Sequence, residues 1–174
     1  MKILKWIGIL LLGIIALALI VAAFAPKEFA SERSIVINKP RAVVFDYIKY
    51  IKNQDNYGKW QLMDPGMKKT YEGTDGTVGF RYSWDSKELD KGSQTITKIV
   101  EGERLETSLD FGFGDPATSF MTTEDAGAGQ TKVTWGISGK SPYPFNLMGL
   151  FYDMGKDFDT GLNNLKNVLE KQGG

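Results

Sequence analysis

The sequence predicts an α+β protein in which a curved antiparallel sheet of about seven strands wraps on a long C-terminal helix, preceded by an N-terminal transmembrane helix. Three patterns indicate this. An uncharged apolar run opens the chain, alternating segments with short turns fill its middle, and an amphipathic segment closes it. We therefore expect two parts: residues 1–26 as a transmembrane anchor and residues 27–174 as one folded domain.

The anchor is predicted from residues 6–25, a run of 20 uncharged positions rich in Ile and Leu. At about 1.5 Å per residue, a helix of that length crosses a hydrocarbon layer of about 30 Å. The alternatives are a cleaved signal peptide, since the Ala-Phe-Ala at 23–25 resembles a cleavage site, and a buried core helix. The run exceeds a typical signal core and Pro26 would follow the cut, so the uncleaved anchor is favoured.

The orientation is predicted from the charges that flank this run. Lys2 and Lys5 precede it, whereas the basic residues at 27 and 33 are offset by acidic neighbours at 28 and 32. The positive-inside rule then predicts a single-pass protein of the cell membrane, with a cytoplasmic N-terminus and an extracytoplasmic domain.

The domain is expected to begin with a strand over residues 29–37 that leads directly from the anchor. Residues 38–40 supply a helix start, and apolar residues between 43 and 51 follow at helical spacing. A short second helix should end near Gly58, followed by a loop as far as Pro65. The large apolar residues of this part either form a pocket rim or anchor the loop; they are Tyr57, Trp60 and Met63.

The sequence pattern of residues 67–139 predicts a series of β-hairpins. Apolar residues alternate with polar ones, and the connections are short and rich in glycine and aspartate. This combination is typical of a meandering antiparallel sheet with one buried face. The expected strands are 67–73, 78–84, 92–100, 104–113, 117–125 and 131–138.

A helix of about six turns is predicted from residue 147 or 148 to Leu169, with a cap at Gly173-Gly174. Apolar residues recur there at three- and four-residue steps. Asp153 and Asp157 lie between them, and we interpret these two as a solvated face rather than a carboxylate pair. The helix is the only expected element long enough to cover the sheet, which gives a helix-grip arrangement.

Composition excludes several kinds of chemistry. The chain has 21 basic and 21 acidic residues and neither histidine nor cysteine. The balanced charge gives no basic footprint for nucleic acid. Disulfides, thiolate or imidazole metal sites and Cys or Ser–His nucleophiles are excluded by the missing residue types. A general base near neutral pH would have to be a carboxylate or lysine with a shifted pKa. We assign no catalytic residue, metal or cofactor.

The chain closely resembles membrane-anchored bacterial members of the START-like (SRPBCC) superfamily, the polyketide cyclase/dehydrase and lipid transport family. Stretches at 25–48, 59–84, 92–111, 131–151 and 155–170 carry the resemblance, which spans residues 26–171. It implies a helix-grip fold with a pocket between the sheet and the C-terminal helix. The superfamily includes lipid carriers, aromatase/cyclases, hydroxylase subunits and chaperone activators, so the fold does not select an activity.

The predicted pocket residues are bulky side chains on the sheet and on the helix that covers it. The residues alone favour a filled core, whereas the resemblance favours a cavity. They are Phe80, Tyr82, Trp84, Leu109, Phe111, Phe120 and Trp135 on the sheet, and Phe151, Met154 and Phe158 on the helix.

The expected function is a membrane-tethered binding domain for a hydrophobic small molecule that is lipid- or polyketide-like. One alternative is a cyclase/dehydrase-type enzyme that uses the same pocket. Another is an envelope interaction or stress protein without a ligand. The absence of histidine favours binding over catalysis. The expected partners are the ligand and the membrane, and no oligomeric state is predicted.

The stretch SPYPFNLMGLFYDM, residues 141–154, is the most apolar part of the domain. Pro142 and Pro144 are expected to end the last strand, because proline cannot donate a ladder hydrogen bond. The rest should start the C-terminal helix. Its apolar side chains are expected to form core together with a pocket entrance; the competing hypotheses are core alone and contact with the bilayer.

Overall fold

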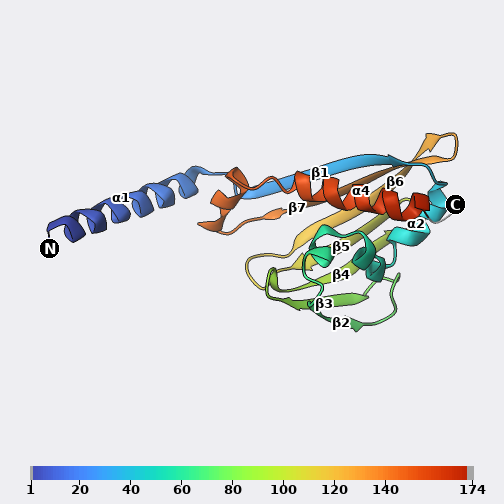
Figure 1. Ribbon diagram of the computed structural model, residues 1–174, viewed down its shortest axis with the longest axis horizontal. Helices are drawn as coiled ribbons and strands as arrows, with labels where there is room; N and C mark the ends of the chain where they lie inside the picture. The colour runs from blue at the N-terminus through green and yellow to red at the C-terminus, as the bar shows by residue number, and fades with distance from the viewer. Residues whose placement is uncertain (1, 172–174) are drawn as a thin grey trace.

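The computed structural model describes residues 2–171 and contains one antiparallel sheet with the strand order β1-β7-β6-β5-β4-β3-β2 (Figure 1). Consecutive strands from β2 to β7 are neighbours, and β1 pairs with β7, which confirms the predicted meander. The strands are β1 (Glu28–Ile37), β2 (Lys68–Glu72), β3 (Arg81–Ser86), β4 (Asp90–Val100), β5 (Arg104–Asp110), β6 (Ala117–Gly127) and β7 (Gln130–Lys140).

Helix α4 (Gly155–Lys171) packs against β1 and β7 and covers one face of the sheet, which confirms the helix-grip arrangement (Figure 1). The short helices between β1 and β2 close the rest of this face; they are α2 (Arg41–Ile48), the 3-10 helix η1 (Ile51–Asn56) and α3 (Lys59–Met63). Because α3 occupies residues 59–63, the expected loop after Gly58 is shorter than predicted.

The best-packed core lies at the end of the sheet where β1 finishes, which we call the α2 end. There Leu162, Leu165 and Leu169 of α4 are buried against Val44 and Ile48 of α2. A second apolar cluster lies under β3 to β5 and includes residues of η1 and of the segment just before β2. In β7 the predicted inward residues at 133, 135 and 137 belong to the core, but residues 134 and 136 between them are buried as well, so the strand does not alternate between buried and exposed positions there.

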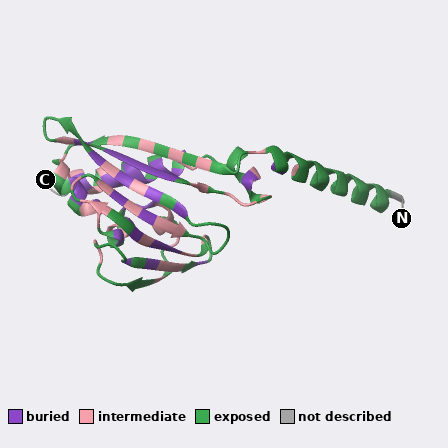
Figure 2. Ribbon diagram, turned by 180° about the vertical axis from the view of Figure 1, so that it is seen from behind, coloured by how far each residue is buried: buried purple, intermediate pink, exposed green. Residues whose placement is uncertain are grey.

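Helix α1 (Lys2–Phe24) projects from the opposite end, which we call the α1 end, and most of its side chains are exposed (Figure 2). Its apolar part, Ile3–Phe24, has the length and composition of a membrane span; a signal sequence has the same properties. Residues 25–27 alone separate α1 from β1, so helix and strand run nearly end to end (Figure 1).

The predicted start of the C-terminal helix is wrong. Residues 145–150 form a separate 3-10 helix, η2 (Phe145–Leu150), and α4 begins only at Gly155. The physical reason is a local turn: Asp153 Oδ1 accepts a hydrogen bond from the Gly155 backbone N–H at 2.9 Å, an Asx turn that gives the helix a new start. The expected cap at Gly173-Gly174 lies outside the described residues.

Candidate ligand-binding site

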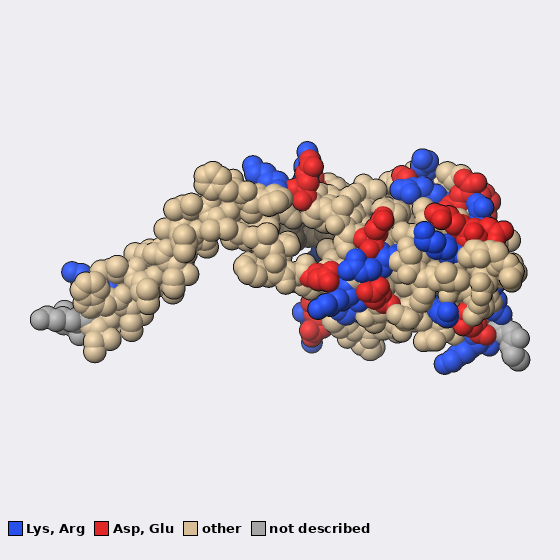
Figure 3. Space-filling model, turned by 90° about the horizontal axis from the view of Figure 1, so that it is seen from above, with Lys and Arg blue, Asp and Glu red and all other residues tan. Residues whose placement is uncertain are grey.

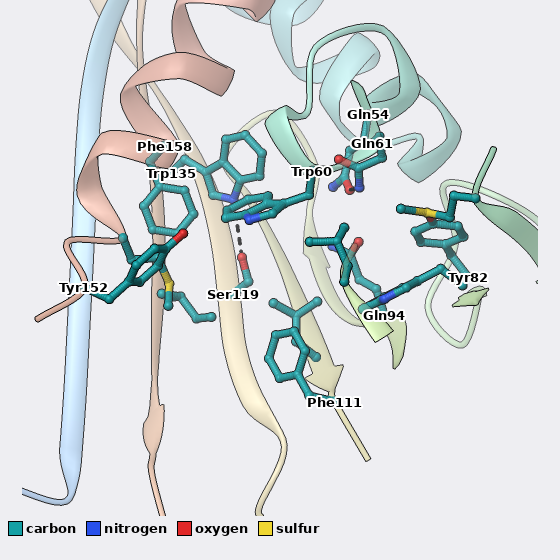
Figure 4. A pocket seen from close by; sticks show the side chains of 16 residues that line it. Gln54, Trp60, Gln61, Tyr82, Gln94, Phe111, Ser119, Trp135, Tyr152 and Phe158 are labelled. Atoms are coloured by element: carbon teal, nitrogen blue, oxygen red, sulfur yellow. Dashed lines mark hydrogen bonds between the residues drawn. The ribbon is translucent and has the colours of Figure 1, made fainter. Parts of the chain in front are cut away.

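An inner cavity of about 200 Å³ lies between the sheet and the first half of α4 (Figure 4). Its walls come from η1, α3, strands β3 to β7 and α4. The first half of α4 contributes one aromatic side chain, Phe158, to the core cluster, whereas the rest of the helix contributes leucines. This difference along a single helix determines where the cavity lies.

Seven of the predicted pocket residues line the inner cavity. Their rings and apolar chains converge from the sheet and from α4. They are Tyr82, Trp84, Leu109, Phe111, Trp135, Met154 and Phe158. Their role in binding a ligand stays a prediction.

The other three predicted residues lie elsewhere. Phe80 is buried in the second apolar cluster, where its ring stacks on Tyr71 with centroids 6.1 Å apart. Phe120 points to the opposite face of β6, where the Arg104 guanidinium lies 4.4 Å from its ring centroid. Phe151 is 87% exposed and lies before α4, because that helix starts later than predicted.

The sequence prediction missed several polar residues that line the cavity. It also expected the wrong set of alternate β6 residues to face inward. Inward residues of β6 are 117, 119, 121 and 123, so the small Ser119 lines the cavity in place of its aromatic neighbour. Trp60, predicted either to form a pocket rim or to anchor its loop, lines the cavity, with its ring edge-to-face against Trp135 and Phe158. Only α3, a five-residue helix too short for a periodic signal, positions Trp60.

Most polar groups in the wall are satisfied by protein partners. Ser119 Oγ donates to the Gly136 carbonyl oxygen at 3.0 Å and accepts from Trp135 Nε1 at 3.3 Å, the bond drawn in Figure 4. Gln94 Nε2 donates to Thr107 Oγ1 at 3.1 Å. These bonds fix the orientation of the side chains that shape the cavity.

Two buried polar atoms in the wall have no hydrogen-bond partner among the described residues. They are the donor Trp84 Nε1 and the acceptor Gln61 Oε1. An unpaired buried polar group costs about 1–3 kcal/mol. Both atoms are fully buried, and the Gln61 amide oxygen packs against Gly58 and the Trp84 indole against Gly92. The surface that the cavity offers to a ligand is therefore mainly apolar.

A buried carboxylate, Asp157, lies at the edge of the cavity. Only 3% of it is exposed, so the predicted solvated helix face is wrong at this position. Lys59 Nζ and the Tyr152 hydroxyl both donate to it. Burial, followed by the hydrogen bond to Asp157 and its charge, raises the pKa of Tyr152 to about 12, which keeps this phenol protonated at neutral pH.

An outer groove of about 570 Å³ adjoins the cavity at the α1 end. Three residues line both spaces: Phe111, Tyr152 and Met154. The remaining wall comes from the start of β1, the β5–β6 connection with the first residue of β6, and residues 140–142, 145, 148–151 and 153. The space-filling view shows a hollow beside the narrow neck that joins α1 to the domain, and this neck is largely uncharged (Figure 3). No group of three or more metal-ligating side chains occurs within residues 2–171.

Comparisons with known proteins agree with the fold. A family model described as "Polyketide cyclase / dehydrase and lipid transport" matches residues 28–170. None of the curated proteins matches the sequence. A norcoclaurine synthase point mutant from Thalictrum flavum, in complex with a transition-state analogue, has 7% identity and a TM-score of 0.65, covering 84% of this chain and 97% of that chain.

Two bacterial structures are similar as well. The Aha1 dimer from Colwellia psychrerythraea has 13% identity and a TM-score of 0.60, covering 84% of this chain and 99% of that chain. A protein from Thermobifida fusca has 16% identity and a TM-score of 0.62, covering 83% and 95%. At such identities the likeness concerns the fold alone.

Proposed function

The chain belongs to the polyketide cyclase/dehydrase and lipid transport family, and we propose that it is a membrane-tethered domain that binds a hydrophobic small molecule between the sheet and α4. The observation that carries this proposal is the inner cavity between the sheet and α4, which is lined mainly by apolar and aromatic side chains. Burial of ligand surface would supply about 25 cal/mol per Å². The Tyr152 hydroxyl, at the junction with the outer groove, is a polar group that would orient the ligand.

The size of the two spaces narrows the ligand class. The inner cavity, about 200 Å³, exceeds the roughly 150 Å³ of a dry cavity that holds benzene. It is smaller than the roughly 300–1,000 Å³ of a site for a drug-sized ligand, a range that includes the outer groove at about 570 Å³. We therefore propose a ligand whose ring or chain end fills the inner cavity and whose remainder lies in the groove, with one hydroxyl or carbonyl group.

In this proposal residues 1–26, which include helix α1, are not cleaved off and serve as the tether of the binding domain at 27–174. The last turn of α1 is held by side chains of the domain. Asn146 Nδ2 donates to the carbonyl oxygens of Ala22 and Ala25 at 2.8 and 3.0 Å, and Ala22 is fully buried. Cleavage within residues 23–25 would remove at least one of these acceptors from a buried amide, and such a loss is costly.

The orientation with the domain outside the cytoplasm is also part of the proposal. Protease added to intact cells should digest the domain and leave α1 protected. Digestion only after lysis would place the domain in the cytoplasm and reverse the orientation.

Ligand binding is tested on the full chain purified in mild detergent. Native mass spectrometry and solvent extraction should find a bound hydrophobic molecule on the parent protein. Leu109→Trp, which puts a larger side chain into the cavity, should lose it, while Val43→Trp on the exposed side of α2 should keep it. A parent protein without ligand, or equal retention by both variants, would contradict the proposal and favour an interaction protein without ligand.

A second candidate function is proton-transfer catalysis of the cyclase/dehydrase type. One observation favours it: the buried Asp157 holds a protonated phenol, Tyr152, at the junction of the cavity and the groove. Tyr152 would turn its single hydroxyl proton from Asp157 to a substrate carbonyl, and Asp157, released from that hydrogen bond, would act as the base that takes a proton from the substrate. Turnover of a polyketone that disappears in Asp157→Asn, with ligand retention unchanged, would establish catalysis. No turnover by the parent protein leaves binding alone.

A further inference from the structure

We propose that residues 143–151, here called the rim, insert into the boundary between headgroups and acyl chains of the lipid bilayer that α1 crosses. The outer groove would then open to the acyl region, and the ligand would be a bilayer amphiphile that enters without crossing water. This inference rests on the proposed tether. It adds a surface, a partner and a route of loading.

The first argument is the position of the rim beside the end of α1, which Figure 1 shows and hydrogen bonds define. The Tyr143 hydroxyl donates to the carbonyl oxygen of Leu19 at 3.3 Å, and Asn146 reaches Ala22 and Ala25. Leu19 lies five residues before the helix end at Phe24, which is about 7–8 Å along the axis. If α1 spans the bilayer, the rim lies at the depth of its last turns.

The second argument is the chemistry of the rim. Residues 143–151 carry no charge. Phe145, Met148 and Phe151 are 53%, 63% and 87% exposed, so their apolar surface has no cover within the protein. Large contiguous apolar patches on a monomer mark interaction sites. Aromatic side chains such as Tyr143 are enriched at the interface between membrane and water.

The third argument concerns the carbonyl groups that end α1. The last four carbonyls of a helix have no partner within the helix, and an unpaired backbone group in hydrocarbon costs several kcal/mol. The Val21 carbonyl oxygen accepts a hydrogen bond from the Ala25 backbone N–H at 2.9 Å. The Ala22 carbonyl oxygen accepts one from the Asn146 side-chain amide. A helix end in water would not need an amide from a distant segment, whereas one at the acyl boundary does.

Ion pairs mark where this apolar region ends. Lys140 pairs with Glu28 at 3.8 Å at the end of β7. Arg33 Nη2 lies 3.5 Å from Oδ1 of Asp153, a residue just past the rim. In Figure 3 the charged atoms gather over the domain, while the neck is mostly without them. These pairs would lie at headgroup level and limit the depth of insertion.

The depth of the rim is tested with the full chain in phosphatidylcholine nanodiscs. Because the chain has no cysteine, single Met148→Cys and Phe151→Cys variants can carry one nitrobenzoxadiazole label each. Both side chains are exposed, so their replacement removes little packing. Leu12→Cys in α1 reports on the tether, and Ala126→Cys in the β6–β7 hairpin, far from α1 in Figure 1, is the aqueous control.

Labels at 148, 151 and 12 should be quenched by doxyl groups on the lipid chains, while the label at 126 should respond only to aqueous iodide. Iodide quenching at 148 and 151 equal to that at 126, with lipid quenching at 12, would overturn the rim and leave the tether intact. Iodide quenching at all four positions would overturn the tether and the rim together.

Loading is tested with cis-parinaric acid, a fluorescent fatty acid that accepts energy from tryptophan. Trp6 lies in α1, so Trp6→Phe leaves three tryptophans, all of which line the inner cavity: Trp60, Trp84 and Trp135. In nanodiscs, energy transfer should rise several-fold more slowly when Tyr143→Glu and Leu147→Glu are added, at two rim positions that line neither the inner cavity nor the outer groove. In detergent micelles, the final transfer should equal that of the protein without these charges.

The outcomes separate the two proposals. If the fatty acid reaches the cavity in nanodiscs at the same rate with and without the added glutamates, the rim is not the route of loading. This conclusion holds whatever ligand the cavity binds. Absence of energy transfer in both nanodiscs and micelles would contradict binding of this lipid class in the cavity. The depth measurement would then decide the position of the rim by itself.

Discussion

The two halves of α4 face the same sheet, yet one half lies in a buried core and the other borders a cavity. At the α2 end, Leu162, Leu165 and Leu169 are at most 2% exposed and belong to the core cluster that includes α2. At the α1 end, Phe158 of α4 and Met154, just before the helix, line the inner cavity. The amount of apolar surface therefore does not decide whether a core is filled.

The shape of the side chains decides it. At the α1 end three rings meet: Trp60 is edge-to-face with Trp135, at 6.0 Å between centroids, and with Phe158, while Trp135 and Phe158 are tilted by 42° with centroids 5.3 Å apart. Rigid rings held at such angles leave gaps beside their edges, and the inner cavity lies there. Leucine side chains at the α2 end can pack at the close density that is usual for protein interiors.

The largest expected effect contrasts the two halves directly. Leu165→Ala should lower the free energy of unfolding by about 2–5 kcal/mol, because it opens a void in a closed core. Leu109→Ala, beside the existing cavity, should cost only about 1–2 kcal/mol. Urea unfolding of the full chain in detergent, followed by circular dichroism, measures both. Equal losses would mean that the cavity end is packed as tightly as the α2 end.

The next effect concerns the buried carboxylate at the start of α4. Asp157→Ala removes the partner of Lys59, which is 35% exposed and can turn to water, so the loss should be about 2–3 kcal/mol rather than the full cost of a buried unpaired charge. Asp159→Ala removes a carboxylate of α4 that is half exposed and pairs with Arg33 at the surface, and it serves as the control, with a loss below about 1 kcal/mol. A smaller loss for Asp157→Ala than for its control would show that the pair does not stabilise this end.

A smaller effect comes from Gly161, where an added Cβ would lie 2.7 Å from Trp135 Cζ3. Overpacking costs about 1–3 kcal/mol, and replacing glycine within a helix returns up to about 1 kcal/mol. Gly161→Ala should therefore destabilise by about 1 kcal/mol and push the indole toward the cavity, which lowers ligand retention. Thr160→Ala, its exposed neighbour, should change neither unfolding nor retention. Unchanged retention in Gly161→Ala would mean that the indole does not bound the ligand space.

The smallest effect is the pH dependence that Tyr152 contributes. Its pKa is raised from the ordinary value near 10 to about 12, so its stabilising contribution is complete below pH 10 and is lost as the pH rises to about 12. Tyr152→Phe should show a shallower loss of stability over that window. Burial also raises the pKa of Tyr57 and Tyr82, but parent and variant share these groups, so the difference reports Tyr152. Identical alkaline profiles would contradict the contact with Asp157.

Local patterns predicted most of the fold, because alternation and helical spacing record which side of an element is buried. The seven strands and the covering helix follow from them. The position of η2 could not be predicted, since it depends on Asn146 meeting α1 more than 120 residues away in sequence. The same limit applies to the site. The β6 strand turns Ser119 inward and Phe120 outward, against the usual preference for apolar residues inside, and only the pairing with β7 reveals it.

If α1 spans a membrane as proposed, the three residues between α1 and β1 limit how far the domain can move from that membrane. A connection of that length spans at most about 10 Å. The hydrogen bond from Asn146 to Ala22 restricts the movement of the domain relative to α1 further. Such a domain cannot swing out to meet a second membrane. It would serve only the leaflet in which it stands, and passage of its cargo across an aqueous gap would require a separate shuttle.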